Sequence, residues 1–364
     1  MNKIFPFILA LVAVCAFFMF RHYFCVYDVE TGHAPSLPEN NTQNPEMTGH
    51  APFLQPVRKS CNSVYYWKTV FSLCDGEKQW LTRHNIGRLY IRYFDVGFDS
   101  NGEPVPLATI RFSEPVPEGL EIVPTVFIDN NLFKHCDMTP YAQRVANRIL
   151  AMSETNDVSN IREVQLDCDW TKTTDTAWFA FAKAVKMELN NHDIALSSTI
   201  RLHQLNMPPP PVDRGVLMCY NTGAVRSNAT GNSILSAGDV ALYDKHLSTY
   251  SLPLDVAYPT FSWAVLFING KFKRLLRQVE PEDEFLAHQK DNKYTVKYGY
   301  YQEGEYLYEG DVIRFEFSDF SEIIKCKRLL EPQLKDFSVI LYHLDNKNLS
   351  KYTTDEINQM YQKP

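Results

Sequence analysis

The feature that most constrains the fold is the alternation of short apolar segments with helix-length spacers from residue 63 onward. The apolar segments are rich in β-branched residues, as strands are, and most of the spacers show helical periodicity. Strand candidates lie at 64–70, 89–96, 122–128, 163–169, 195–205, 215–221, 254–261 and 338–343, and helical patterns at 77–84, 141–153, 176–190, 237–247 and 354–361. Such alternation is typical of parallel βα units. It predicts an α/β fold, a (β/α)8 TIM-type barrel, with an open doubly wound sheet as the alternative.

Two further patterns refine this prediction. The sequence contains neither G-x-G-x-x-G nor G-x-x-x-x-G-K-[ST], the loops with which open sheets usually hold nucleotides. Between the seventh and eighth strands, residues 271–336 form an insertion with a tyrosine-dense stretch at 294–308 and an alternating pattern at 312–317. We expect a hairpin or small sheet there, either over the mouth of the barrel or as a small accessory module.

The N-terminal residues indicate where the protein resides. An apolar run at 4–20 lies between Lys3 and Arg21, which predicts a signal anchor or signal peptide over 1–25, with a lipoprotein signal as a variant. Residues 26–57 repeat the pentapeptide TGHAP and read as a flexible linker, so the barrel occupies 58–364. We expect the body to be exported to the cell envelope, with membrane contact through the N-terminal segment only.

Composition narrows the classes of ligand. The net charge of -7 argues against nucleic acid as a partner, because phosphate binding needs clustered Lys and Arg. The eight cysteines show no C-x-x-C spacing, so the sequence predicts no metal site and no cofactor. The 20 Tyr, 23 Phe and 5 Trp residues could fill a core or form platforms for sugar rings.

The fourth predicted strand ends in two acids on one face. Side chains alternate along a strand, so Asp167 and Asp169 point one way while Cys168 and Trp170 point the other. A helical pattern follows at once, and the carboxyl ends of barrel strands are where active sites lie. The two carboxylates therefore indicate a site that handles a polar substrate, although a structural ion pair with Arg92 or Arg201 is the alternative reading.

Other polar and aromatic side chains fall at the ends of the remaining strands. Charged side chains are rarely buried without partners, so a hydrogen-bonded cleft is expected where the strand ends meet. The residues predicted to contact substrate are Arg92, Arg201, His203, Tyr220, Asn221, Tyr258, Trp263 and His343.

Two short motifs resemble the glycoside hydrolase family 18 (chitinase-like) barrels. That family ends its fourth strand in D-x-x-D-x-D-x-E and carries M-x-Y-D on its sixth, and this chain has VQLDCDWT at 164–171 and MCYN at 218–221. The resemblance implies that Asp167 and Asp169 match the last two aspartates and that Tyr220 helps to position a substrate acetamido group. Thr171 stands where the family has its catalytic glutamic acid, and Asn221 replaces an aspartate. More broadly, the chain is similar to anchored glycosidase-like barrels of bacterial envelopes.

These observations predict an envelope-anchored glycoside hydrolase-like barrel acting on a polysaccharide or another glycan. Glycoside hydrolysis needs a proton donor and a base or nucleophile. We assign Asp169 as the acid and Asp167 as its electrostatic partner, with Asp95, Asp345 or Glu316 as candidates for the second group. The rival hypothesis is a non-catalytic barrel that binds a glycan or a protein, and the third is a metal-dependent hydrolase using Asp167, Asp169, His203 and His343.

Overall fold

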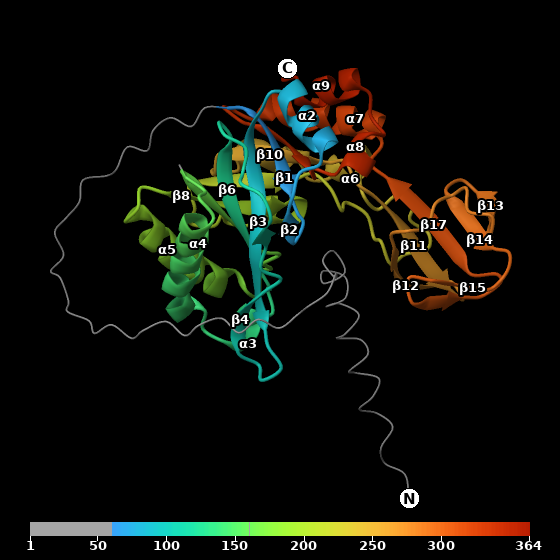
Figure 1. Cartoon of the computed structure of the whole chain (residues 1–364), viewed down its shortest axis with the longest axis horizontal. Helices are drawn as coiled ribbons and strands as arrows, with labels where there is room; N and C mark the ends of the chain where they lie inside the picture. Colours follow the sequence, from blue (N-terminus) through green and yellow to red (C-terminus); the bar gives the residue numbers. More distant parts are fainter. Residues whose placement is uncertain (1–59, 160) are drawn as a thin grey trace, which may run out of the picture. The chain divides into compact units, whose positions relative to one another are not determined.

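Eight parallel strands close into a barrel in the computed structural model, which describes residues 60–159 and 161–364 (Figure 1). Each strand pairs in parallel with the next, and β1 pairs with both β3 and β18, which closes the ring. The barrel strands are β1 (Asn62–Tyr66), β3 (Ile86–Phe98), β6 (Glu121–Ile128), β7 (Glu163–Asp167), β8 (Ala195–Arg201), β9 (Arg214–Met218), β10 (Leu254–Pro259) and β18 (Val339–Tyr342). The predicted (β/α)8 barrel is confirmed, and the open doubly wound sheet is excluded.

Helices and turns connect the strands along the outside of the ring. The longest two, α4 (Ala142–Thr155) and α5 (Asp175–Asn190), lie side by side in Figure 1. The other helices are α2 (Asp75–Arg83), α3 (Leu132–His135), α6 (Ala237–Val240), α7 (Phe320–Leu330), α8 (Asn346–Leu349) and α9 (Thr354–Tyr361), with 3-10 turns η1 (Thr139–Tyr141), η2 (Leu202–Asn206), η3 (Asp244–Thr249) and η4 (Glu331–Gln333). The helix expected over 237–247 is in fact split between α6 and η3.

A second sheet lies in the chain between β10 and β18. It orders five antiparallel strands as β12-β11-β17-β14-β13, and its strands gather together in Figure 1. We call it the accessory sheet; it begins at Ser262, before the expected residue 271, and α7 follows it. Its strands, with the β15–β16 hairpin, are β11 (Ser262–Ile268), β12 (Lys271–Leu276), β13 (Leu286–Lys290), β14 (Lys293–Val296), β15 (Tyr300–Gln302), β16 (Glu305–Leu307) and β17 (Val312–Phe317).

Shorter strands extend the barrel on one side. β4 (Pro104–Leu107) folds back antiparallel on the long strand β3. β2 (Val70–Phe71) and β5 (Arg111–Phe112) pair separately. No helix within residues 60–159 and 161–364 is both long and apolar enough to cross a bilayer. The predicted signal segment at 1–25 and linker at 26–57 lie outside the described residues.

Candidate functional site

The face of β7 that carries Gln165 and Asp167 points into the barrel. The Tyr65 hydroxyl on β1 donates to Gln165 Oε1 at 2.7 Å, and the Thr199 hydroxyl on β8 donates to Asp167 Oδ1 at 2.8 Å. Residues of the opposite face are fully buried against the helices, and the Trp170 ring meets Phe179 of α5 with centroids 5.2 Å apart. The predicted alternation along this strand is therefore confirmed, and Trp170 is a packing residue.

Asp169 lies just past the end of β7 and forms an ion pair. Arg201 Nε lies 2.6 Å from Asp169 Oδ1, and the Asp169 side chain keeps 44% of its surface exposed. Burial disfavours the charge of Arg201, but Asp169, Asp167 and Tyr220 favour it more strongly, so the pKa of Arg201 lies above its ordinary value. The pair places an accessible carboxylate oxygen beside a permanent positive charge.

Tyr220 borders this ion pair with an aromatic wall. Its ring stacks on Tyr342 of β18, with centroids 5.1 Å apart at 29°, and the Arg201 guanidinium lies 5.9 Å from the Tyr220 ring centre. Burial, helped by Tyr342, raises the pKa of Tyr220 well above its ordinary value. The neighbouring Asn221 is exposed and has φ of 55°, a left-handed conformation that Asn tolerates better than most residues.

Arg92 enters the same region from β3. It is buried, donates from Nε to Asp95 Oδ1 at 2.8 Å, and its guanidinium lies 5.7 Å from the ring centre of Trp67. The register of β3 against β6 shifts between Arg92 and Phe94. This bulge is what brings Asp95 to the same side as Arg92, because residues three apart on a regular strand face opposite ways.

Two predicted substrate contacts, Tyr258 and Trp263, lie elsewhere in the structure, and His203 lies on a turn and not on a strand. β8 ends at Arg201 and the chain continues as η2, so His203 lies on an exposed 3-10 turn, where it still interacts electrostatically with Asp169 and Arg201. Tyr258 is fully buried on the outer side of β10, where its hydroxyl lies 3.2 Å from Glu331 Oε1. Trp263 belongs to β11 of the accessory sheet, so it does not sit at a barrel strand end.

His343 follows β18 and is buried, with 8% of its surface exposed. Its Nδ1 has no hydrogen-bond partner within the described residues. Burial lowers the pKa of His343 to about 4, and the opposing effect of Asp345 is smaller. The imidazole is therefore neutral at physiological pH.

The low pKa of His343 predicts a pH-dependent stability. The unfolded chain gains a proton near the ordinary value of 6.5, whereas the folded chain gains it only near 4, so the free energy of unfolding falls as pH decreases through that window. The loss for this one group is about 3 kcal/mol. Urea unfolding measures this loss at neutral pH and at about pH 4. Between the two conditions, the free energy of unfolding should fall by about 3 kcal/mol less in His343→Gln than in the parent. Parallel losses in both proteins would contradict the assignment.

The acids proposed as second catalytic groups are all engaged in contacts of their own. Asp95 is held by Arg92, as described above. Asp345 caps α8 by accepting from the Asn348 amide at 3.0 Å. Glu316 is buried beside Arg314 on β17 and accepts from Trp263 Nε1 at 2.7 Å. Each carboxylate therefore has a structural role in this conformation.

The residues of the metal hypothesis do not form a metal-binding group. Within residues 60–159 and 161–364, no three His, Cys, Asp or Glu side chains are arranged to hold an ion. Asp167 and Asp169 contact Thr199 and Arg201, while His203 lies on the exposed turn η2.

An aromatic cluster around Tyr342 was missed as a unit by the sequence reasoning. Tyr65 and Phe261 both contact Tyr342, with ring centroids 5.5 and 5.8 Å away. Tyr65 and Trp67 stand two residues apart, so alternation along the first strand places both rings on one face. This alternation is the signal that could have revealed an aromatic group at the end of that strand. Together with Tyr220, these rings form the wall beside Asp169 and Arg201.

Comparison with known proteins shows similarity in fold but none in sequence. No family model matches the sequence, and no curated protein matches it. The structure is similar to the chitinase of Chromobacterium violaceum ATCC 12472, with a TM-score of 0.50 at 9% identity over 84% of this chain and 100% of that one. The Bacillus cereus spore cortex-lytic enzyme gives 0.49 at 14% identity over 84% and 75%, and an Ostrinia furnacalis Group IV chitinase gives 0.46 at 11% over 83% and 100%. The Chromobacterium likeness agrees with the closed eight-stranded barrel.

Proposed function

We propose that this chain acts on a polysaccharide or another glycan at the mouth of its barrel, as a glycoside hydrolase-like protein anchored at the cell envelope. The observation that carries the proposal is the group of Asp169, Arg201 and Tyr220 at the carboxyl ends of adjacent strands. An accessible carboxylate and a guanidinium can bind sugar hydroxyls, and tyrosine rings can pack against sugar rings. The chitinase fold similarity and the resemblance at 164–171 and 218–221 support the same substrate class.

In the catalytic form of this proposal, Asp169 is the group nearest the reacting glycosidic bond. An ion pair with Arg201 favours the charged carboxylate, whereas a proton donor must be neutral. Asp169 is therefore better suited to stabilise positive charge on the sugar than to donate the proton while Arg201 is in contact. Asp167, buried beneath it and bonded to Thr199, supports the charge balance of Asp169 and Arg201.

A non-catalytic glycan- or protein-binding barrel is the second candidate. It is favoured by Thr171, which occupies the position of the family's catalytic glutamic acid and bonds to its neighbour Thr173. The engagement of Asp95, Asp345 and Glu316 in other contacts favours it too. In this form, Asp169, Arg201 and Tyr220 bind a glycan that the protein holds without cleaving it.

A glycan panel tests both forms. The full chain and its Asp167→Asn/Asp169→Asn variant are incubated with polysaccharides and peptidoglycan-type glycans, and binding and released reducing ends are recorded. Product from the parent alone supports hydrolysis dependent on the two acids. Binding without product supports the second candidate. The absence of both binding and product across the panel would contradict the proposal.

A further inference from the structure

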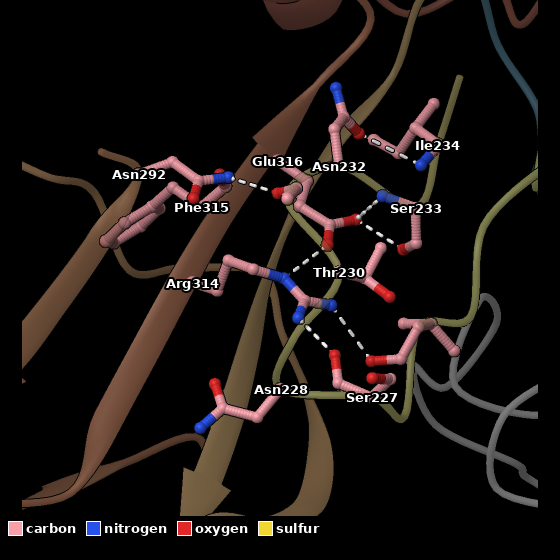
Figure 2. A network of polar contacts seen from close by, with 12 residues as sticks. Ser227, Asn228, Thr230, Asn232, Ser233, Ile234, Asn292, Arg314, Phe315 and Glu316 are labelled. Atoms are coloured by element: carbon pink, nitrogen blue, oxygen red, sulfur yellow. Dashed lines mark hydrogen bonds and ion pairs between the residues drawn. The ribbon is translucent and has the colours of Figure 1, made fainter. Parts of the chain in front are cut away.

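A buried ion pair on β17 faces the loop that follows β9. Arg314 and Glu316 are 0% and 1% exposed, and Arg314 Nε lies 2.5 Å from Glu316 Oε1. Residues two apart on a strand share a face, so both side chains leave the accessory sheet in the same direction. Figure 2 shows them reaching the segment that carries Ser227 and Ser233.

The pair holds this loop at two separate points. Arg314 donates to the carbonyl oxygens of Ser227 and Val225 at 2.6 and 2.9 Å. Glu316 Oε2 accepts from the Ser233 amide at 3.0 Å and also from the Ser233 hydroxyl. The loop between Met218 of β9 and Ala237 of α6 contains no helix or strand, so these contacts replace the regular hydrogen bonds that the loop lacks.

Neighbouring residues of the accessory sheet add to this attachment. Asn292 donates to the Gly231 carbonyl at 2.7 Å, and Asn232 of the loop donates back to the Phe317 carbonyl at 2.8 Å. Lys293 donates to the Asn228 carbonyl at 2.6 Å. Arg314 and Glu316 are the buried, charged centre of this set (Figure 2).

Two chains of contacts lead from Glu316 to the candidate site. Along the backbone, Glu316 holds Ser233, and the carbonyl of the next residue, Ile234, accepts from the Asn221 amide at 2.6 Å. Through aromatic rings, Trp263 donates to Glu316 at 2.7 Å and packs on Phe261 at 5.1 Å, and Phe261 lies 5.9 Å from Tyr220. Both chains end on consecutive residues at the barrel mouth.

A buried ion pair adds little net stability compared with well-packed apolar residues, but it fixes the orientation of the groups that it contacts. Glu316 accepts four hydrogen bonds, and a carboxylate with so many donors tolerates few orientations of them. We infer that Arg314 and Glu316 are positioning residues: they hold the loop 219–236 so that Tyr220 and Asn221 face a glycan at the barrel mouth. The inference rests on the proposed function for the ligand, and on the contacts alone for the positioning.

The test combines amide hydrogen exchange with glycan binding in the full chain. Glu316→Gln keeps the shape of the side chain and removes the charge that Arg314, Ser233 and Trp263 contact. Exchange across 221–234 should become at least about tenfold faster, and glycan affinity should fall by at least about tenfold, because charge-assisted hydrogen bonds are lost. Amides of β7 should exchange as in the parent.

Two variants separate positioning from general damage. Glu305→Gln makes the same carboxylate-to-amide change on β16. Glu305 forms a partly exposed pair with Lys273 of β12 at 3.3 Å, so the variant should leave amide exchange and glycan binding unchanged. If Glu316→Gln does not fold, Ser233→Ala removes one contact only and should speed exchange across 221–234 a few-fold, by about the worth of one hydrogen bond.

Parent-like exchange across 221–234 in Glu316→Gln, or in Ser233→Ala where the former does not fold, would overturn the positioning role. Faster exchange with unchanged glycan affinity would overturn its link to the site. If the parent itself binds no glycan, the proposed function fails, and the exchange measurements still decide whether the pair positions the loop.

Discussion

The Asp169→Asn variant is expected to release reducing ends from a hydrolysed glycan at least about 100-fold more slowly than the parent, the usual effect of losing a charged group at a reacting centre. The Asp169 side chain is 44% exposed but Arg201 only 19%, so the substitution should also lower the unfolding midpoint, and rates are compared where both proteins are folded. The loss arises because an amide cannot offset positive charge on the sugar or balance Arg201. Initial rates and binding affinity, measured together, give the result.

Asp345→Asn is the matched control for this variant. It makes the same carboxylate-to-amide change near another strand end, but Asp345 caps α8 through Asn348, and Asn caps helices equally well. The control should keep parent activity and stability. Full activity in Asp169→Asn would end the role assigned to Asp169, and loss of activity in Asp345→Asn would identify Asp345 as the second acid.

Lys327→Met is expected to lower the free energy of unfolding by about 3–5 kcal/mol, because it leaves a buried carboxylate without its cation. Lys327 on α7 pairs with Glu331, and both side chains are buried against Tyr258. Lys327 also donates to the Met360 carbonyl at 2.7 Å, which ties α7 to α9. Burial lowers the pKa of Lys327 and raises that of Glu331, as expected for a pair held away from water. Urea unfolding at neutral pH measures the effect.

Lys325→Met provides the comparison on the same helix. Lys325 pairs with Glu322 at 2.6 Å, but its side chain is 57% exposed. Exposed pairs contribute little to stability, so this variant should unfold at the same urea concentration as the parent. Equal destabilisation by both substitutions would show that α7 responds to the change of residue type and not to the buried charge.

The barrel could be predicted from the sequence because its signal is local. Each strand is a short apolar segment, and the spacers between strands have helical periodicity. The opposite directions of Asp167 and Trp170 also follow from alternation alone, whereas the contact of Trp170 with α5 is seen only in the structure. Arg201 as a partner of the acids follows from the same pattern on β8.

The positions of the remaining site residues depend on where the strands end, and the local sequence specifies strand ends only weakly. β8 stops at Arg201 and turns into η2, which removes His203 from the strand face. Tyr258 alternates to the outer face of β10, where Glu331 on a distant segment accepts its hydroxyl. The pairing of Glu316 with Arg314 and Ser233 joins residues far apart in the chain, and no local pattern specifies it.

A crystal structure of the full chain with the tightest-binding glycan of the panel tests the central proposal most directly. Sugar density is expected at the barrel mouth, in contact with Asp169, Arg201 and the Tyr220 ring. Density confined to another surface, such as the exposed Tyr298, Tyr301 and Tyr308 near the β15–β16 hairpin, would contradict it.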